Sequence, residues 1–340
     1  MAEQSPIRVA VVGVGAFGKN HARVYHELAQ QGHGVEMVGV VDLSAAQAKS
    51  VAAQFGCKAL TNVEDLFGRV DAATVAVPTV HHLAVAAKLM AAGIDVLIEK
   101  PLASSLDEAD ELIRLAEANQ RIVQVGHLER FNPAVRATLP LLTRPMFFEV
   151  HRLSVFTPRS LDVDVVLDLM IHDIDVVLAF ARSEVKEIRA VGLPVVSGKV
   201  DIANVRLEFE SGCVANLTAS RISTERVRKL RFFQPREYIS VDYARQDVLQ
   251  FRVASEEKFS LDELLASIGA PDASPIPGVT IHRPAVRQEE PLHAELMSFV
   301  DAVRRRSRPV VALEDGRRAL QVALEILAVI AEHSQRAGLS

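Results

Sequence analysis

The stretch VVGVGAFGKNHARVY, residues 11–25, passes from an apolar run through three glycines into a segment with helical spacing. Gly13, Gly15 and Gly18 form the pattern G-x-G-x-x-G where a strand is expected to end and a helix to begin. There the first glycine permits a tight turn, the second lets a diphosphate approach the main chain, and the third lets helix and strand pack closely. The stretch predicts a dinucleotide site; a glycine-rich turn without a ligand is the alternative.

A carboxylate supports the dinucleotide interpretation. Asp42 ends the next apolar run, VEMVGVVD, and lies 24 residues after Gly18. A carboxylate at this place accepts hydrogen bonds from the ribose hydroxyls, and it repels the 2′-phosphate that distinguishes NADP. Because no Arg or Lys occurs in the following DLSAAQ, we expect NAD as the cofactor in preference to NADP.

The surrounding sequence shows two different patterns of apolar residues. In residues 7–125 short β-branched runs alternate with helix-like stretches, and runs such as ATVAVP and DVLIEK are apolar throughout. This pattern is typical of a parallel sheet that is covered by helices on both faces. From about residue 145 long strands are joined by turns, which predicts an antiparallel sheet. Five prolines between Pro271 and Pro291 predict an irregular loop, and two helices end the chain.

These two patterns predict an α/β fold class with two domains, and the length of 340 residues also suggests two domains. Residues 1–125 are expected to form a Rossmann domain with a doubly wound parallel sheet. Residues 126–340 are expected to form a second α/β domain with a large, mostly antiparallel open sheet. The C-terminal helices are expected either to stay with this second domain or to pack back on the first.

Composition excludes several classes of protein. No apolar run approaches the roughly 20 residues of a membrane span, and the first residues lack a basic flank before an apolar stretch, so we expect a cytoplasmic protein. A net charge of -5 gives no bulk attraction to nucleic acid or a membrane. The basic segment RVRKLRFF, residues 226–233, is interpreted as a strand edge that faces solvent or another subunit. Cys57 and Cys213 are expected to be core thiols, and no metal site is indicated.

Two further patterns carry candidate chemistry. Lys100 follows Glu99 at the end of a strand, on the edge where doubly wound sheets bind ligands. Asp168 and His172 are spaced i and i+4, which places a carboxylate and an imidazole on one helix face and is suited to a general base. The structural alternatives are a solvated lysine paired with its neighbouring glutamate, and a buried polar pair or helix cap.

Taken together, G-x-G-x-x-G, AVPTVHH (76–82), EKP (99–101) and DLMIHDID (168–175) resemble the glucose-fructose oxidoreductase, inositol dehydrogenase and MocA family over nearly the whole chain. The resemblance implies that Lys100 contacts nicotinamide ribose and substrate, that His172 is the base, and that Asp168 assists it. It also implies a homo-oligomer, a dimer or tetramer, that assembles through the open sheet. The cofactor-binding residues expected on these grounds are Gly13, Gly15, Ala16, Phe17, Gly18, Asp42, Pro78, Thr79, His82, Glu99 and Lys100.

Two longer stretches, GHLERFNPA (126–134) and EVHRLSVFTPRSLDVDVVLDLMIHD (149–173), resemble a narrower branch of that family. Its members oxidise the 3-hydroxyl of UDP-N-acetylglucosamine to a ketone on the way to a diamino sugar of lipid A in lipopolysaccharide. Forked arginines suit an anionic nucleotide sugar, although each one could equally be a solvated or interface charge. The substrate-binding residues expected on these grounds are Arg130, Asn132, His151, Arg152 and Arg159.

Other functions stay open at this point. The family also contains dehydrogenases of other sugars, polyols such as inositol, and uronic acids. Some relatives use tightly held NAD transiently to cleave glycosidic bonds, and a non-catalytic NAD-responsive binding protein is a further alternative. Released NADH would separate the dehydrogenases from the last two classes.

Overall fold

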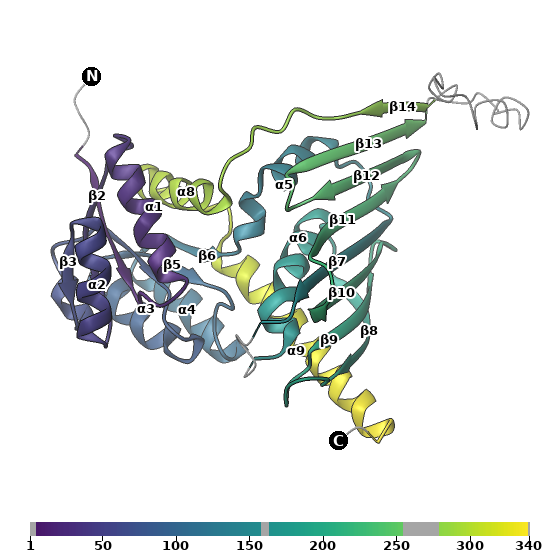
Figure 1. The fold of residues 1–340 in the computed structure, drawn as a ribbon, viewed down its shortest axis with the longest axis horizontal. Helices are drawn as coiled ribbons and strands as arrows, with labels where there is room; N and C mark the ends of the chain where they lie inside the picture. The colour runs from purple at the N-terminus through teal and green to yellow at the C-terminus, as the bar shows by residue number, and fades with distance from the viewer. Residues whose placement is uncertain (1–4, 158–162, 254–278, 339–340) are drawn as a thin grey trace, which may run out of the picture. The chain divides into compact units, whose positions relative to one another are not determined.

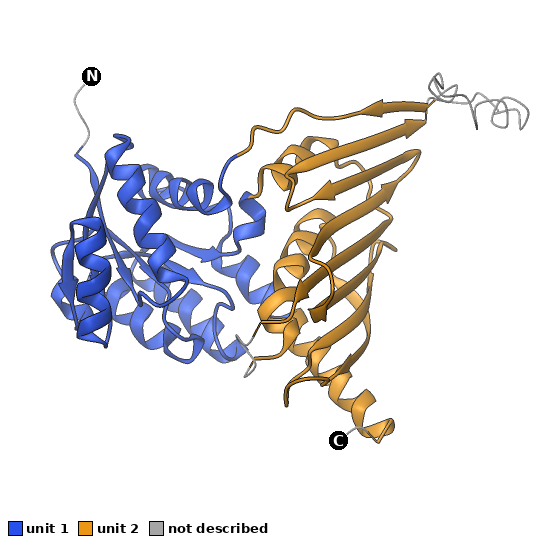
Figure 2. Ribbon diagram, viewed as in Figure 1, with its two compact units in different colours: residues 1–131, 289–321 blue, residues 132–288, 322–340 orange. Residues whose placement is uncertain are grey.

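The computed structural model describes residues 5–157, 163–253 and 279–338 (Figure 1). The chain forms two compact units, and Figure 2 shows them in different colours. The first unit comprises residues 1–131 and 289–321, and the second comprises residues 132–288 and 322–340. Helix α9 (Leu313–Arg336) begins in the first unit and ends in the second.

The other elements of the first unit follow each other in Rossmann order. They are β1 (Ile7–Val12), α1 (Gly18–Gln30), β2 (Val35–Val41), α2 (Ala45–Phe55), β3 (Lys58–Leu60), the short helix η1 (Val63–Leu66), β4 (Ala72–Val75), η2 (Thr79–His81), α3 (His82–Ala91), β5 (Asp95–Glu99), α4 (Leu106–Ala118), β6 (Val123–Gly126), η3 (Leu128–Phe131) and α8 (Pro291–Arg305).

The first sheet is parallel throughout, with the strand order β3-β2-β1-β4-β5-β6. The order reverses between β1 and β4, and ligands of doubly wound sheets bind at such a point. Apolar side chains of β1, β2, α1, α2 and α8 share one buried core. The predicted doubly wound parallel sheet is confirmed, and it fixes the edge at which a cofactor is held.

Helix termini in this unit follow the local sequence. The Ser44 side chain accepts the Gln47 N–H at the start of α2, which ends at Gly56 in the left-handed region with φ 66°. The Ser105 side chain accepts the Glu108 N–H at the start of α4. Such caps satisfy backbone groups that the first and last turns leave without partners. The capping residues thus determine where the helices that join the parallel strands begin and end.

The second unit contains a larger sheet. Its elements are α5 (Pro133–Thr138), η4 (Leu139–Leu141), β7 (Phe147–Val155), the π-helical turn η5 (Val166–Met170), α6 (Ile171–Ala181), β8 (Val185–Leu193), β9 (Ile202–Phe209), β10 (Val214–Ser223), β11 (Val227–Gln234), β12 (Glu237–Asp242), β13 (Asp247–Val253) and β14 (Val279–His282).

The strand order of this sheet is β14-β13-β12-β11-β7-β10-β9-β8. Only the β7–β10 pair is parallel among the strand pairs of the described residues. Figure 1 shows α5 and α6 along one face of the sheet. Burial alternates along β7, where Phe148, Val150 and Arg152 are buried and the residues between them are partly exposed. The predicted mostly antiparallel sheet is confirmed.

Two local predictions were wrong. The basic segment 226–233 is not a strand edge, because β11 pairs with β7 on one side and β12 on the other. Arg231 Nη1 of this segment lies 3.0 Å from Glu149 Oε2 of β7. This ion pair balances the charge of the arginine. The proline-rich segment 271–291 is not irregular throughout, since residues 279–282 form β14 against β13. Proline is tolerated beside such an edge strand because it has no ladder N–H to offer. The earlier part of that segment lies outside the described residues.

The described part of the chain contains no helix that is long and apolar enough to cross a bilayer. It also contains no group of three or more His, Cys, Asp or Glu side chains placed to hold a metal ion. Cys213 is buried and Cys57 is half-buried. Burial raises the pKa of Cys213 to about 11 and also raises the pKa of Cys57. Both cysteines are therefore thiols rather than reactive thiolates.

Candidate active site

The three glycines of the β1–α1 turn have different reasons to be glycine. Gly13 has φ +84°, and a Cβ there would lie 2.7 Å from the Ala76 carbonyl oxygen. A Cβ on Gly18 would lie 1.8 Å from the Gly13 oxygen, so neither position admits a side chain. A Cβ on Gly15 would meet no protein atom within 4 Å. Packing therefore does not require a glycine at 15, and the bare backbone there leaves room for a diphosphate to approach.

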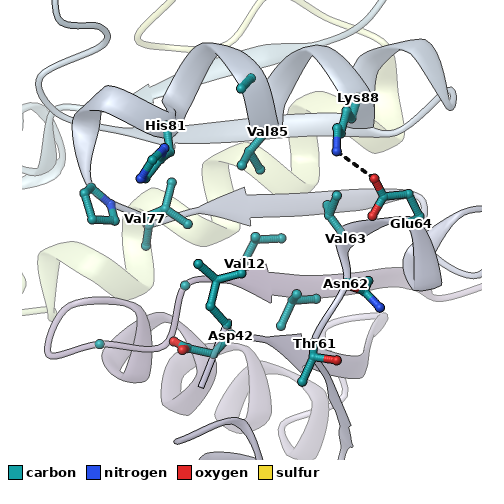
Figure 3. A pocket seen from close by; sticks show the side chains of 17 residues that line it. Val12, Asp42, Thr61, Asn62, Val63, Glu64, Val77, His81, Val85 and Lys88 are labelled. Atoms are coloured by element: carbon teal, nitrogen blue, oxygen red, sulfur yellow. Dashed lines mark hydrogen bonds and ion pairs between the residues drawn. The ribbon is translucent and has the colours of Figure 1, made fainter. Parts of the chain in front are cut away.

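A pocket of about 620 Å³ opens beside this turn (Figure 3). Its wall combines a carboxylate directly after β2, apolar side chains, the polar Thr61 and Asn62, and an ion pair. The lining residues are Val12, Gly13, Gly15, Val41, Asp42, Leu43, Thr61, Asn62, Val63, Glu64, Ala76, Val77, Pro78, His81, Ala84, Val85 and Lys88. The volume, the switch-point position and the composition all fit the adenosine half of a dinucleotide.

Asp42 is held in place by backbone donors. Its Oδ2 accepts the Val14 N–H at 3.0 Å, and its Oδ1 accepts the Ser44 N–H at 2.9 Å. A carboxylate has about four acceptor positions, so these two bonds leave capacity for ribose hydroxyls. The half-buried carboxylate is thus oriented before any ligand binds.

Asp42→Ser is expected to weaken NAD binding by about 1.5 to 3 kcal/mol through loss of charge-assisted hydrogen bonds. Loss of the negative charge also removes the repulsion of a 2′-phosphate, so the preference for NAD over NADP should narrow or invert. Calorimetric titration with both cofactors measures this. Asp42→Asn keeps one acceptor oxygen and loses the negative charge. Comparing it with Asp42→Ser therefore separates the effect of the hydrogen bond from the effect of the charge. An unchanged NAD affinity in Asp42→Ser would mean that the ribose is bound elsewhere.

The residues expected beside the cofactor are placed differently. Pro78 lines the pocket, whereas Thr79 and His82 do not. The His82 ring is buried, with Nε2 at 2.9 Å from the Val77 oxygen and Nδ1 at 3.2 Å from the Leu102 oxygen. Burial lowers the pKa of His82. This histidine bridges two backbone segments, and the neighbouring His81 faces the pocket instead (Figure 3).

Ala16, Phe17 and Gly18 form the turn into α1 and are not among the pocket residues. Phe17 is 46% exposed. No acidic residue occupies the first turn of α1, so its N–H groups remain suited to an anion.

The Glu99 side chain points into the protein. Its Oε1 lies 2.8 Å from His21 Nε2, and its Oε2 accepts the Lys100 backbone N–H at 3.2 Å. Gly126 makes room for this carboxylate, because a Cβ there would lie 2.9 Å from Oε1. Glu99 thus anchors the turn that carries Lys100, at the end of β5.

Glu295 of α8 was not foreseen. Its side chain is fully buried in the first unit, and neither carboxylate oxygen has a hydrogen-bond partner among the described residues. Burial raises the pKa of Glu295 well above its usual range, and the negative charge of Glu99 raises it further. Glu295 therefore favours its protonated, neutral form more strongly than an exposed glutamate does.

Glu295→Gln is expected to stabilise the protein at alkaline pH and to leave it nearly unchanged near pH 4.5. The folded-state pKa lies above the unfolded one, so the stability that the buried acid contributes is present at low pH and is lost as pH rises toward the folded pKa. Across that window the wild type loses up to about 1.4 kcal/mol per pH unit, and the amide does not. Denaturant unfolding from pH 5 to 9 measures the difference. The exposed Glu332→Gln is the control, and parallel curves for Glu295→Gln and wild type would contradict the assignment.

His127 is a second buried ionisable group near the end of β6. Burial lowers its pKa to about 3, and the positive charges of Arg130 and Lys100 contribute. His127 is consequently neutral across the physiological range. Arg130 Nη2 lies 3.8 Å from Asp315 Oδ1 in the same unit.

In the second unit the two candidate proton-transfer residues lie on consecutive turns. Asp168 belongs to the π-helical turn η5, and His172 is the second residue of α6. Both are half-buried. π-Helical turns within helices occur frequently at functional sites. The predicted apolar helix is present, although this turn widens its first part.

Two of the expected substrate ligands make hydrogen bonds within the protein. The Arg152 guanidinium is 3% exposed and binds Asp173 through Nε at 2.5 Å and Nη2 at 2.8 Å. It also lies over the Tyr243 ring, with Cζ 5.4 Å from the centroid. Asn132 is the N-cap of α5, and its Nδ2 donates to the backbone carbonyl oxygen of Tyr243 at 3.1 Å. Both side chains thus have partners within the protein, and their expected contact with substrate stays a prediction.

His151 is separated from Arg152 by the pleat of β7. Successive side chains of a strand point to opposite faces, and the burial pattern puts Arg152 on the face that α6 covers. His151 and Arg152 therefore lie on opposite faces of the sheet. Arg159 lies outside the described residues.

The sequence interpretation also missed the pocket face of α3. His81, Ala84, Val85 and Lys88 line the pocket at the spacing of one helix face, and that spacing was a readable signal. Glu295 offered a similar signal, since it interrupts the apolar stripe of α8 that includes Leu292, Leu296 and Phe299.

Comparison with known proteins identifies relatives over the whole chain. Residues 7–127 match the GFO/IDH/MocA oxidoreductase family with its NAD-binding Rossmann fold, and residues 145–236 match the GFO/IDH/MocA C-terminal domain. The UDP-N-acetylglucosamine 3-dehydrogenase of Acidithiobacillus ferrooxidans is 36% identical over 97% of this chain and 99% of its own length. A crystal structure of that enzyme, GnnA, has a TM-score of 0.85 and covers 96% of this chain and 98% of its own, at 33% identity.

An inositol 2-dehydrogenase of Acidothermus cellulolyticus is similar over a shorter region. It is 31% identical over 204 residues, which are 56% of this chain and 58% of that enzyme. The solved myo-inositol 2-dehydrogenase of Lactobacillus plantarum has a TM-score of 0.77 at 20% identity, covering 97% of this chain and 98% of its own, a likeness of fold.

Proposed function

This chain belongs to the GFO/IDH/MocA family of NAD-binding oxidoreductases, and we propose that it oxidises the 3-hydroxyl of UDP-N-acetylglucosamine to the 3-keto sugar. The observation that carries the proposal is the full-length similarity to an enzyme of that activity, 36% identical over 97% of this chain. Intact Lys100, Asp168 and His172 support a catalytic rather than a purely binding role. We further propose that the keto sugar is used for lipid A, as the resemblance of the sequence to that branch of the family implies.

The chain's residues have complementary tasks in this proposal. NAD, when bound, accepts a hydride from the carbinol carbon. His172 removes the hydroxyl proton, and Asp168 supports the imidazole in this role. The Lys100 ammonium lowers the cost of the negative charge that develops on the oxygen. Gly13, Gly15 and Asp42 hold the dinucleotide.

The proposal is tested by NADH formation against a panel of UDP-sugars, free sugars and inositols. UDP-N-acetylglucosamine should give the highest kcat/KM. A higher value with an inositol or a free sugar would assign the chain to another branch of the family. Cleavage of a glycosidic bond without net NADH would indicate the hydrolytic class.

We also propose that the second unit joins two copies of the chain through the uncovered face of its sheet. A ladder of aromatic side chains crosses four strands there: Phe147 stacks on Phe233 with centroids 5.6 Å apart, Phe233 contacts Tyr238 at 5.0 Å, and Tyr238 contacts Phe251 at 5.6 Å. Phe233 is 38% exposed. An exposed aromatic cluster of this kind is typical of an interface.

Phe233→Arg is expected to shift the protein from an oligomer to the mass of a single chain, because an unpaired cation would be buried at the interface. Light scattering after size exclusion measures the mass. Val310→Arg, an exposed apolar position of the first unit, is the matched control. The same oligomeric mass for the wild type and Phe233→Arg would contradict an interface at the open sheet.

A further inference from the structure

An ion pair forms part of the pocket wall on the side away from Asp42 (Figure 3). Lys88 Nζ lies 2.7 Å from Glu64 Oε1. Lys88 comes from α3, at the end of the face that also presents His81 and Val85, and Glu64 comes from the first turn of η1. Among the residues that line the pocket, Lys88 is the only Lys or Arg.

The region between Asp42 and this ion pair contains apolar side chains next to the polar Thr61 and Asn62 (Figure 3). Figure 3 shows Val12, Val63 and Val85 there. Aliphatic side chains contact a planar ring over its faces and leave the polar atoms on its edge to other groups. A base attached to a ribose at Asp42 would reach these apolar side chains, with its edge toward Glu64 and Lys88.

The two charged groups offer opposite hydrogen-bonding functions. A carboxylate only accepts, and an ammonium only donates; the carboxylate has two oxygens and the ammonium has three N–H groups, so their mutual bond does not exhaust either. The hydrogen bond from Lys88 lowers the pKa of Glu64, which keeps this residue an acceptor. Adenine presents a donor at N6 and an acceptor at N1, and hypoxanthine presents the reverse, an acceptor at O6 and a donor at N1.

We propose that Glu64 and Lys88 recognise the adenine edge of the cofactor: Glu64 accepts a hydrogen bond from the N6 amino group, and Lys88 donates to N1. This inference rests on the proposed NAD-dependent function and names the residues that select its nucleobase. Both side chains are about half exposed, 50% for Glu64 and 56% for Lys88. Solvent competes at such positions, so the discrimination is several-fold rather than hundredfold.

The test compares dissociation constants for NAD and nicotinamide hypoxanthine dinucleotide. The wild type should prefer NAD about fivefold, the scale of one or two partly exposed hydrogen bonds. Lys88→Met should reduce this preference to about twofold or less by weakening NAD alone. Glu64→Gln should have the same effect by another route, because a side-chain amide can offer either a donor or an acceptor and so fits both bases.

A second exposed ion pair provides the control. Lys186 Nζ lies 3.1 Å from Glu208 Oε1 in the other unit, and Glu208→Gln should leave both dissociation constants unchanged. A wild type that binds the two dinucleotides equally, or variants that keep the wild-type preference, would overturn the inference and leave the dehydrogenase proposal standing. A wild type that binds neither dinucleotide would contradict the dehydrogenase proposal, and the inference would fall with it.

Discussion

Lys100→Met is expected to lower kcat by about a hundredfold or more while NAD still binds. Methionine keeps the length of the side chain and removes the charge that would stabilise the developing oxyanion, and loss of one such electrostatic group usually costs this much. The pocket residues Gly13, Gly15 and Asp42 are untouched by the substitution. The backbone N–H at position 100 also remains available to Glu99 Oε2.

Steady-state kinetics with the best substrate of the panel and calorimetric titration with NAD measure the two quantities separately. Lys49→Met removes an exposed lysine of α2 and controls for the change of net charge. A wild-type kcat in Lys100→Met would contradict a catalytic role. Lys100 would then be a solvated charge at the end of β5.

His172→Asn is expected to lower kcat on a similar scale and to change its pH dependence. A histidine acts as a base only when it is neutral, and its ordinary pKa is about 6.5, so turnover of the wild type should rise with pH through that region. Asparagine cannot take the proton, and the rise should disappear. NAD affinity should be unaffected, because none of the pocket residues comes from α6.

The measurement is kcat from pH 5 to 9 for the wild type and His172→Asn, with Asp168→Asn as a companion. Loss of Asp168 should reduce kcat and retain a rise with pH, since the imidazole remains. If His172→Asn keeps both the rate and the profile of the wild type, His172 is a structural residue of α6 and the base must be sought elsewhere.

Much of the fold was readable because it depends on local chemistry. The turn at Gly13 requires a positive φ, and a Cβ at Gly18 would meet the Gly13 oxygen, so both glycines signal the strand–turn–helix that they form. Continuous apolar runs indicated the parallel strands, and long strand-like segments joined by turns indicated the second sheet. β3 was missed because three residues, Lys58–Leu60, are too short to show a period.

The candidate site was readable where a motif fixes the backbone and less so where function depends on the partner of a side chain. Arg152 has the chemistry of a phosphate ligand, and only the fold shows that its guanidinium is engaged by Asp173. Asn132 is a common N-cap residue followed by a proline, a signal that favoured a cap over a substrate ligand. Lys88 and Glu64 are 24 positions apart, and no local pattern relates them.

The most direct measurement uses UDP-N-acetylglucosamine that carries deuterium at C3 of the sugar. Oxidation at that carbon moves the hydride to NAD and releases the hydroxyl proton, so the NADH formed should be heavier by one mass unit, and kcat/KM should show a primary isotope effect when hydride transfer limits the rate. Mass spectrometry of the NADH gives the answer in a single turnover. NADH of ordinary mass would place the oxidation at another carbon, and no NADH at all would contradict the assignment of this chain as a UDP-N-acetylglucosamine 3-dehydrogenase.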